Sequence, residues 1–307
     1  MGSDFAMSIT FEGQVAIVTG AGNGLGRSHA LALAKRGAKL VINDPARDAE
    51  GKSAAEDVAA LIAAEGGEAI ANTDSVADFA AMGAMAEKAL SKWGRIDVLV
   101  NNAGLLRDKS FANMDMADFR TVIDVHLMGS AYCTKAVWAA MREQHYGRIA
   151  MTTSASGLYG SFGQANYSAA KMGLVGLMNT LHLEGAKYDI RVNCLAPIAS
   201  TAMTEQILDE TQHLAMTTES VSAALVYLVS GDAPHRTILC AGAGSYSATK
   251  IYETEGIFLA PEDQTPENVA VGIDAILDPE GQKAMADGGE QAKKFAEKFL
   301  AELPSAS

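Results

Sequence analysis

Tyr167 and Lys171 lie four positions apart in a segment of helical periodicity, so their side chains project from one face of the expected helix. The pKa of an unperturbed tyrosine is about 10, and lowering it by two to three units takes roughly 3–4 kcal/mol. An ammonium group about 4 Å away supplies on the order of 4 kcal/mol at an effective dielectric constant of about 20. Lys171 can therefore make Tyr167 a proton-transfer residue near neutral pH. The alternative is an exposed helix pair, because this spacing is common by chance.

Ser154 adds a hydroxyl group at the end of the expected strand Arg148–Thr152, thirteen positions before Tyr167. A hydroxyl in that place could hold a substrate oxygen beside the tyrosine. Ser154, Tyr167 and Lys171 together indicate proton transfer to or from a substrate oxygen, and we assign all three as catalytic.

A second group of residues has the pattern of a dinucleotide site. The strand Gln14–Thr19 leads directly into Gly20-Ala21-Gly22-Asn23-Gly24-Leu25-Gly26, and a helix follows. The glycines allow a sharp turn and a close approach to a pyrophosphate, whose charge then faces the positive end of the helix. A purely structural turn is the alternative, which the flanking strand and helix disfavour. We assign to cofactor binding Gly20, Asn23, Gly24, Leu25 and Gly26.

The second expected strand ends at Asp44, eighteen residues after Gly26. An acidic side chain at this distance can accept hydrogen bonds from the ribose hydroxyls of NAD and would repel the 2′-phosphate of NADP. The sequence therefore favours NAD as the cofactor. Arg47 is a nearby cation that keeps NADP open, and an Asp-Pro turn with Pro45 is a further reading of Asp44.

Charge and composition exclude several classes of partner. The 307 residues include 24 basic and 37 acidic ones, for a formal net charge of -13 that would repel nucleic acid and anionic membranes. No apolar run approaches a membrane span, so a soluble protein is expected. Cys133, Cys194 and Cys240 lack the spacing of a disulfide framework or a zinc site, which favours a cytoplasmic location and no metal.

Short apolar runs alternate with longer helical patterns, which predicts an α/β fold with a doubly wound, seven-stranded parallel sheet of the Rossmann type. The expected strands are Gln14–Thr19, Lys39–Asn43, Glu68–Asn72, Val98–Asn101, Arg148–Thr152, Arg191–Leu195 and Thr237–Ala241. The expected helices are Gly24–Arg36, Ala54–Glu65, Phe79–Lys92, Ala117–Glu143 and Tyr167–Lys187, with a C-terminal helix over Gly281–Leu300.

The domain organisation is expected to be simple. Residues 1–7 are interpreted as a tag remnant and the start, 8–245 as the catalytic domain, and 246–307 as a C-terminal helical extension packed on it. The irregular stretch Thr201–Val221 is either a mobile substrate cover or an ordinary pair of surface helices.

The order of the motifs resembles that of the short-chain dehydrogenase/reductase superfamily, over about Thr10 to Ala241. These motifs are the glycine loop, Asn101-Asn102-Ala103-Gly104, Ser154, Tyr167 and Lys171. The resemblance implies an alcohol–ketone oxidoreductase in which Lys171 also binds the nicotinamide ribose. It further implies cofactor contacts by Asp74, Ser75, Asn102, Ala103, Gly104, Tyr167, Pro197 and Thr201.

His126 stands where this superfamily usually has an asparagine in its central helix. A lone histidine in a helix is more often a packed residue than a catalyst. In the context of the resemblance, however, His126 could hold the water that links Lys171 to solvent, because either ring nitrogen can donate or accept a hydrogen bond. We include His126 among the catalytic candidates.

Three features resemble a narrower group, the (3R)-hydroxyacyl-CoA dehydrogenase domains of peroxisomal multifunctional enzyme type 2 and their bacterial relatives. They are the segment Asn101–Phe111, His126, and the segment Gly157–Asn166. The resemblance implies NAD-dependent oxidation of a (3R)-3-hydroxyacyl-CoA to the 3-ketoacyl-CoA. A dehydrogenase of hydroxysteroids or other apolar secondary alcohols is the alternative, and a catalytically idle NAD-binding interaction protein is an alternative of another class.

Small residues in the helix Tyr167–Lys187, among them Ala169, Ala170 and Gly173, would allow close approach of a partner helix. Related enzymes pair through this helix and the one before it, so the resemblance implies a homodimer or homotetramer. Packing against the chain's own sheet explains small residues equally well.

Overall fold

The computed structural model describes residues 9–200 and 215–301. Two compact units divide the chain, residues 1–248 and 249–307. Within the described residues, eight strands form one sheet in the order β3-β2-β1-β4-β5-β6-β7-β8. They are β1 (Val15–Thr19), β2 (Lys39–Asn43), β3 (Ala69–Asn72), β4 (Val98–Asn101), β5 (Gly147–Thr152), β6 (Ile190–Pro197), β7 (Ile238–Gly242) and β8 (Ser245–Thr249). The strands β1 to β7 pair in parallel, which confirms the expected doubly wound sheet.

The sequence predicts seven strands, and the structure corrects this number to eight. Ala243 and Gly244, with φ of 50° and 72°, form a two-residue connection between β7 and β8. A turn of this kind joins neighbouring strands as an antiparallel hairpin. The residues of β8 are largely exposed, so this edge strand lacks the apolar run by which the buried strands can be found in the sequence.

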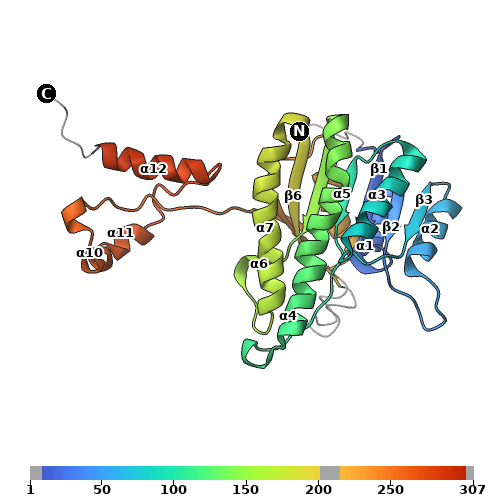
Figure 1. Ribbon diagram of the computed structural model, residues 1–307, viewed down its shortest axis with the longest axis horizontal. Helices are drawn as coiled ribbons and strands as arrows, with labels where there is room; N and C mark the ends of the chain where they lie inside the picture. The colour runs from blue at the N-terminus through green and yellow to red at the C-terminus, as the bar shows by residue number, and fades with distance from the viewer. Residues whose placement is uncertain (1–8, 201–214, 302–307) are drawn as a thin grey trace. The chain divides into compact units, whose positions relative to one another are not determined.

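Helices cover both faces of the sheet and enclose two apolar cores. One core lies between the sheet and α1 (Gly24–Ala34), α2 (Ala54–Ala64) and α9 (Thr218–Leu228). The other lies between the sheet and α3 (Phe79–Trp93), α5 (Gly129–Gln144) and α7 (Ala165–Gly185). Figure 1 shows α5 and α7 running side by side across one face. Because both faces are covered, strands such as β1 are buried at every residue.

The expected single helix over residues 117–143 is divided in the structure. The helix α4 (Met116–Ile123) passes into a π-helical turn, Asp124–Met128, before α5 begins at Gly129. A π-helical turn inserts an extra residue without breaking the axis, so the apolar periodicity on either side still resembles one helix. The catalytic candidate His126 lies at the centre of this turn.

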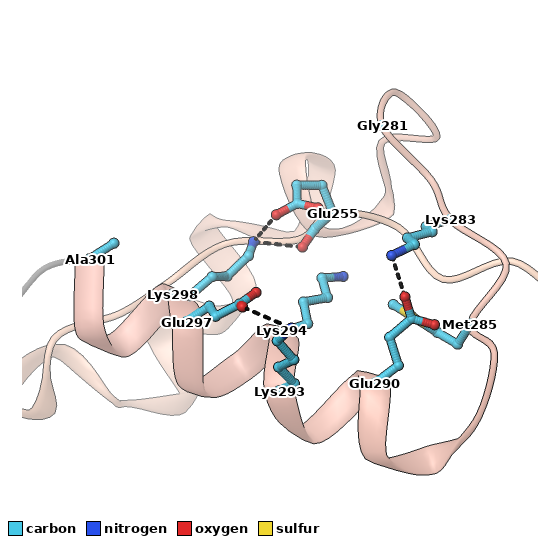
Figure 2. A pocket seen from close by; sticks show the side chains of 10 residues that line it. All are labelled: Glu255, Gly281, Lys283, Met285, Glu290, Lys293, Lys294, Glu297, Lys298 and Ala301. Carbon is cyan, nitrogen blue, oxygen red and sulfur yellow. Dashed lines mark hydrogen bonds and ion pairs between the residues drawn. The ribbon is translucent and has the colours of Figure 1, made fainter.

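The second unit contains α10 (Pro266–Val271), α11 (Ile273–Leu277) and α12 (Gly288–Ala301). The predicted C-terminal helix over 281–300 therefore begins seven residues later than expected. In α12, Lys294 and Lys298 donate to the backbone oxygens of Thr254 and Glu255, and the ion pairs of this unit border a hollow of about 420 Å³ (Figure 2). The packing of the extension on the catalytic domain stays a prediction.

Candidate active site

Ser154, Tyr167 and Lys171 gather where β5 ends and α7 begins. Ser154 caps the short helix α6 (Ala155–Tyr159) directly after β5, and its hydroxyl is hydrogen-bonded to the phenol of Tyr167. Tyr167 lies in the first turn of α7 and Lys171 lies one turn later, with Nζ 5.4 Å from the centre of the Tyr167 ring. The three predicted catalytic residues therefore converge, as the helical spacing of Tyr167 and Lys171 requires.

The side chain of Lys171 is buried and makes one short hydrogen bond. Its side chain is 3% exposed, and Nζ donates to the backbone oxygen of Thr152 at 2.6 Å. Burial lowers the pKa of Lys171 to about 7, because the charged form loses its hydration. The side chain can therefore change between its ammonium and amine forms near neutral pH.

The pKa of Tyr167 differs from the sequence-based expectation. Burial raises this pKa above its ordinary value of 10.0, while the hydrogen bond with Ser154 lowers it and the nearby charge of Asp108 raises it further. The expected lowering by Lys171 requires a full positive charge. Lys171 is itself near its own pKa in this buried position, so its charge is only partly present at neutral pH.

His126 packs directly against the catalytic tyrosine. Its ring is 1% exposed and meets the Tyr167 ring edge-on, with 5.1 Å between the ring centres. Nε2 of His126 lies 2.8 Å from the backbone oxygen of Leu105 and 3.0 Å from the backbone nitrogen of Leu105. A protonated Nε2 can donate to the oxygen and an unprotonated Nε2 can accept from the nitrogen, so either tautomer is bound to Leu105. Burial, and next the charge of Lys171, lower the pKa of His126 to about 3.

The neutral imidazole of His126 supports the loop after β4. Gly104 leaves room for the ring, since a Cβ atom at that position would lie 2.3 Å from Cε1 of His126. Nδ1 is buried, and among the described residues it has no hydrogen-bond partner. The geometry therefore gives His126 a positioning role toward Leu105, and its expected role in the proton path stays a prediction.

Asn166 ties the same loop to the catalytic helix, and the motif analysis did not single it out. The side chain of Asn166 is fully buried, donates to the backbone oxygen of Arg107 at 3.0 Å and accepts from the Tyr167 nitrogen at 2.7 Å. Its neighbour Gln164 donates to Asp108 at 2.7 Å. These contacts join segments about sixty residues apart, which local sequence patterns do not reveal.

The glycine loop is packed too tightly for side chains at Gly20, Gly22 and Gly26, and at Gly20 and Gly26 the obstacle is the backbone itself. Gly20 has φ of +61°, and a Cβ atom there would lie 2.7 Å from Cα of Ala103. A Cβ atom at Gly26 would lie 2.1 Å from the backbone oxygen of Gly20. This close packing brings the backbone nitrogens at the start of α1 together with Asn23, Gly24 and Leu25, which is the cradle that a pyrophosphate requires.

Asn102 and Ala103 stabilise this cradle from β4. The side chain of Asn102 donates to the backbone oxygens of Thr19 and Gly20 at 3.0 and 3.2 Å. The backbone nitrogens of Asn102 and Ala103 both donate to Oγ1 of Thr19, each at 3.0 Å. The resemblance implies that this segment lines the nicotinamide ribose, and the structure adds that the Asn102 amide holds the loop itself.

Asp44 lies at the carboxyl end of β2 and faces the glycine loop. It is 8% exposed, and its two oxygens accept from the backbone nitrogens of Gly22 at 2.9 Å and Ala46 at 2.8 Å. A carboxylate offers about four acceptor positions, so capacity remains for ribose hydroxyls. An adjoining hollow of about 390 Å³ is lined by Arg27, Arg47 and Lys52 among others.

The remaining predicted cofactor residues lie at the same edge of the sheet, with one exception. Asp74 and Ser75 follow β3 and are exposed; Asp74 accepts from the Asn72 amide at 2.7 Å. Pro197 ends β6 and is half-buried. Thr201 lies outside the described residues, as does most of the stretch Thr201–Val221.

Two general findings limit the chemistry of the described residues. No helix among them is both long and apolar enough to pass through a membrane. No group of three or more His, Cys, Asp or Glu side chains gathers there in a geometry that could hold a metal ion.

Comparison with known proteins places this geometry in context. Residues 14–212 match the family model of short chain dehydrogenases. Peroxisomal multifunctional enzyme type 2 of Mus musculus is 45% identical over 280 residues, which cover 89% of this chain and 38% of the mouse protein. A short-chain type dehydrogenase/reductase of Mycobacterium tuberculosis is 43% identical over 277 residues, which cover 88% of this chain and 96% of that protein. The chain thus spans little more than a third of its mouse relative.

Solved structures give the same picture. The full-length peroxisomal multifunctional enzyme type 2 of Drosophila melanogaster superposes with a TM-score of 0.81 at 35% identity, covering 97% of this chain and 51% of that one. A 7α-hydroxysteroid dehydrogenase complexed with NADH and 7-oxo glycochenodeoxycholic acid superposes with a TM-score of 0.70 at 27% identity, covering 77% and 95%.

Proposed function

Because the chain belongs to the short chain dehydrogenase family, we propose that it oxidises a (3R)-3-hydroxyacyl-CoA to the 3-ketoacyl-CoA with NAD. The observation that carries this proposal is the convergence of Ser154, Tyr167 and Lys171 beside a glycine loop shaped for a dinucleotide. The sequence identity of 45% to peroxisomal multifunctional enzyme type 2, over 89% of this chain, supports the substrate class.

The side chains divide the proton chemistry among them. Ser154 and Tyr167 share a hydrogen bond, so a substrate oxygen held between them would be positioned by both. Tyr167 takes the proton of the 3-hydroxyl group in its phenolate form, so its own proton must first pass on. Lys171, with a pKa near 7, is the neighbouring group that can accept this proton as a neutral amine. When bound, a nicotinamide ring supplies the acceptor for the hydride from C3. Asn102, Ala103, Gly104, Tyr167 and Lys171 would hold its ribose.

Asp44 supports NAD over NADP. Its carboxylate is largely buried beside the glycine loop, where a 2′-phosphate would meet a like charge. The NADH in the structure of the hydroxysteroid dehydrogenase supports a nicotinamide cofactor in general. Pro197 and Thr201 complete the proposed cofactor set, together with Asp74 and Ser75 at the adenine.

The substrate proposal is tested by comparing NAD-linked turnover of a (3R)-3-hydroxyacyl-CoA with that of the free hydroxy acid and of a hydroxysteroid. We expect the largest kcat/KM for the CoA thioester. Faster turnover of the uncharged alcohol would overturn the substrate assignment and favour the second candidate, a hydroxysteroid dehydrogenase, which the bile-acid ligand of the related structure supports.

A catalytically idle, NAD-binding interaction protein remains the candidate of another class. The complete set of Ser154, Tyr167 and Lys171 argues against it. For assembly we propose a homodimer or homotetramer through α5 and α7. The cytoplasm is the proposed compartment, supported by the separated cysteines, whereas the names of several relatives refer to peroxisomes.

A further inference from the structure

Arg107 and Lys109 lie in the loop that follows β4 and passes the catalytic tyrosine. Their side chains are about half exposed, and their charged nitrogens lie 3.6 and 3.7 Å from the carboxylate of Asp118. Both distances exceed the roughly 2.7–2.9 Å of a charge-assisted hydrogen bond. Asp108 lies between the two cations in the chain, so the loop offers an anion exposed cationic donors in weak ion pairs rather than an excess of positive charge.

Another pair of cationic side chains in this chain has a structural role. Arg148 and Arg191 also share one carboxylate, that of Asp189, but at 3.0 and 3.1 Å. Arg148 is 1% exposed and further bound to the backbone oxygens of Ser230 and Asp189. The donors of Arg148 are committed to the fold, whereas the side chains of Arg107 and Lys109 are about half exposed and make fewer and longer contacts.

The backbone of the cationic loop is fixed relative to the catalytic helix. Asn166 bridges the Arg107 oxygen and the Tyr167 nitrogen, and the Lys109 nitrogen donates to the backbone oxygen of Gly163 at 2.9 Å. The two cationic side chains therefore start from a defined position beside Tyr167. Their charged ends are about half exposed and are held only by the long ion pairs with Asp118 and, for Arg107, by a bond from Nη1 to the backbone oxygen of the adjacent Leu106 at 3.0 Å.

The same two segments expose large aromatic side chains. Phe111 is 70% exposed, Tyr159 is 70% exposed and Phe162 is 96% exposed. Exposed apolar groups of this size, close to cations, suit a ligand that combines an apolar part with an anionic part. A chain with a net charge of -13 also needs local cations to attract a substrate that carries several phosphates.

We propose that Arg107 and Lys109 bind phosphate groups of the CoA moiety of the substrate, with Phe111 and Phe162 bordering its apolar acyl part. This inference rests on the proposed function and adds the residues that recognise the thioester's anionic portion. Asp118 holds the two cations next to each other until the phosphates displace it as their partner.

The test compares two thioesters of the same (3R)-3-hydroxyacyl group, one with CoA and one with N-acetylcysteamine, which carries no phosphate. In the double variant Arg107→Gln, Lys109→Gln we expect KM for the CoA thioester to rise about tenfold or more at low salt, equivalent to about 1.4 kcal/mol. We expect kcat to stay unchanged, and KM for the N-acetylcysteamine thioester to stay unchanged as well.

Two control variants separate recognition from loop structure. Arg120→Gln removes a nearby cation that pairs with Asp124, one helical turn away. This variant should leave KM unchanged for both the CoA and the N-acetylcysteamine thioester. Arg107→Lys with Lys109→Arg keeps the charges and should retain most of the affinity. An equal rise of KM for both thioesters, or no rise for either, overturns the subsite while leaving the proposed function intact. Failure of the unaltered protein to oxidise either thioester overturns the proposed function and the subsite with it.

Discussion

The glycine loop and the start of α7 lie at the same carboxyl edge of the sheet, yet they are built differently. Around the loop, backbone atoms approach one another so closely that a methyl group at Gly26 would lie 2.1 Å from an oxygen. Around α7, the close neighbours are titratable side chains, the buried Lys171 and His126 and the half-buried Tyr167. The nucleotide end is therefore sensitive to size, and the catalytic end is sensitive to charge.

This contrast has a functional reason. A pyrophosphate is bound mainly by backbone nitrogens, so the protein must bring main chain near it and exclude side chains. A proton is moved efficiently by a group whose pKa lies near the working pH, and burial achieves this for Lys171 by removing the hydration of its ammonium form. Substitutions chosen by size or by charge should therefore separate the two ends.

The largest effect is expected for Gly26→Ala. The added methyl group would collide with the Gly20 oxygen and with the Asn102 amide, at 2.1 and 2.5 Å, and both atoms belong to the cradle itself. We expect NADH affinity, measured by fluorescence titration, to fall more than about 100-fold, because phosphate contacts are lost with the loop geometry. Gly83→Ala, where nothing lies within 4 Å of the new methyl group, is the matched control and should bind normally. Wild-type affinity in Gly26→Ala would break the contrast.

Lys171→Met tests charge at the catalytic end. We expect kcat to fall by about 10²-fold or more, within the usual contribution of acid–base groups. The pKa of Lys171 is about 7 in the folded protein and 10.5 when unfolded, so the unfolded state binds more protons between these values and stability rises with pH. Urea unfolding between pH 7 and pH 9 should show a slope smaller by up to about 1.4 kcal/mol per pH unit in the variant.

Lys135→Met, on the exposed side of α5, is the control for the lysine experiment and should keep the wild-type slope. An unchanged slope in Lys171→Met would mean that the ammonium is already hydrated in the folded protein, and the charge-based description of this end would be wrong.

A smaller effect is expected for Asp44→Ser. Removing the carboxylate removes both a ribose acceptor and the repulsion of a 2′-phosphate. The ratio of kcat/KM for NAD to that for NADP should fall by about tenfold or more, since each 1.4 kcal/mol is a factor of ten. Glu50→Gln, an exposed acid in the following loop, should leave the ratio unchanged. A constant ratio in Asp44→Ser would remove the argument for NAD.

The smallest effect on activity is expected at His29, a titratable residue in α1, the helix that follows the glycine loop. It is fully buried in α1, its Nδ1 lies 2.8 Å from the Ser222 hydroxyl, and burial lowers its pKa to about 3. The unfolded state therefore binds the proton first as the pH falls below 6.5, and stability is lost from there toward pH 3. In His29→Leu, the free energy of unfolding should fall less steeply as the pH is lowered, by up to about 1.4 kcal/mol per pH unit. The kcat of the variant at pH 8 should stay near wild type.

Urea unfolding of the His29 variant at pH 7 and pH 4.5 measures this directly. His145→Asn, at an exposed position with positive φ that asparagine tolerates, is the control and should behave as wild type. Equal acid sensitivity in His29→Leu and wild type would contradict the lowered pKa of His29 and its burial as the cause.

Much of the fold could be predicted because its signals are local. Strands β1 and β2 are uninterrupted apolar runs buried on both faces, and their expected bounds differ from the observed ones by at most one residue. The strand β8 escaped prediction because its exposed residues carry no apolar pattern, and its partner is found only through the turn at Ala243-Gly244. The π-helical turn around His126 is likewise invisible to a helical period.

The site could be predicted to the extent that spacing along one helix or one loop defines it. Tyr167 and Lys171 follow from their separation, and Gly26 follows from the loop pattern. The contacts of His126 with Leu105 and of Asn166 with Arg107 join distant segments, so only the folded chain reveals them. The lowered pKa of Lys171 depends on burial by several elements and could not be read from the spacing that suggested its role.

The most direct test of the central claim is Tyr167→Phe, with turnover and NADH binding measured on the same preparation. We expect NADH affinity to stay within about twofold of wild type, while NAD-linked turnover falls at least about 10²-fold because the proton acceptor is gone. Unchanged turnover, or parallel loss of turnover and NADH binding, would contradict the assignment of proton transfer to Tyr167.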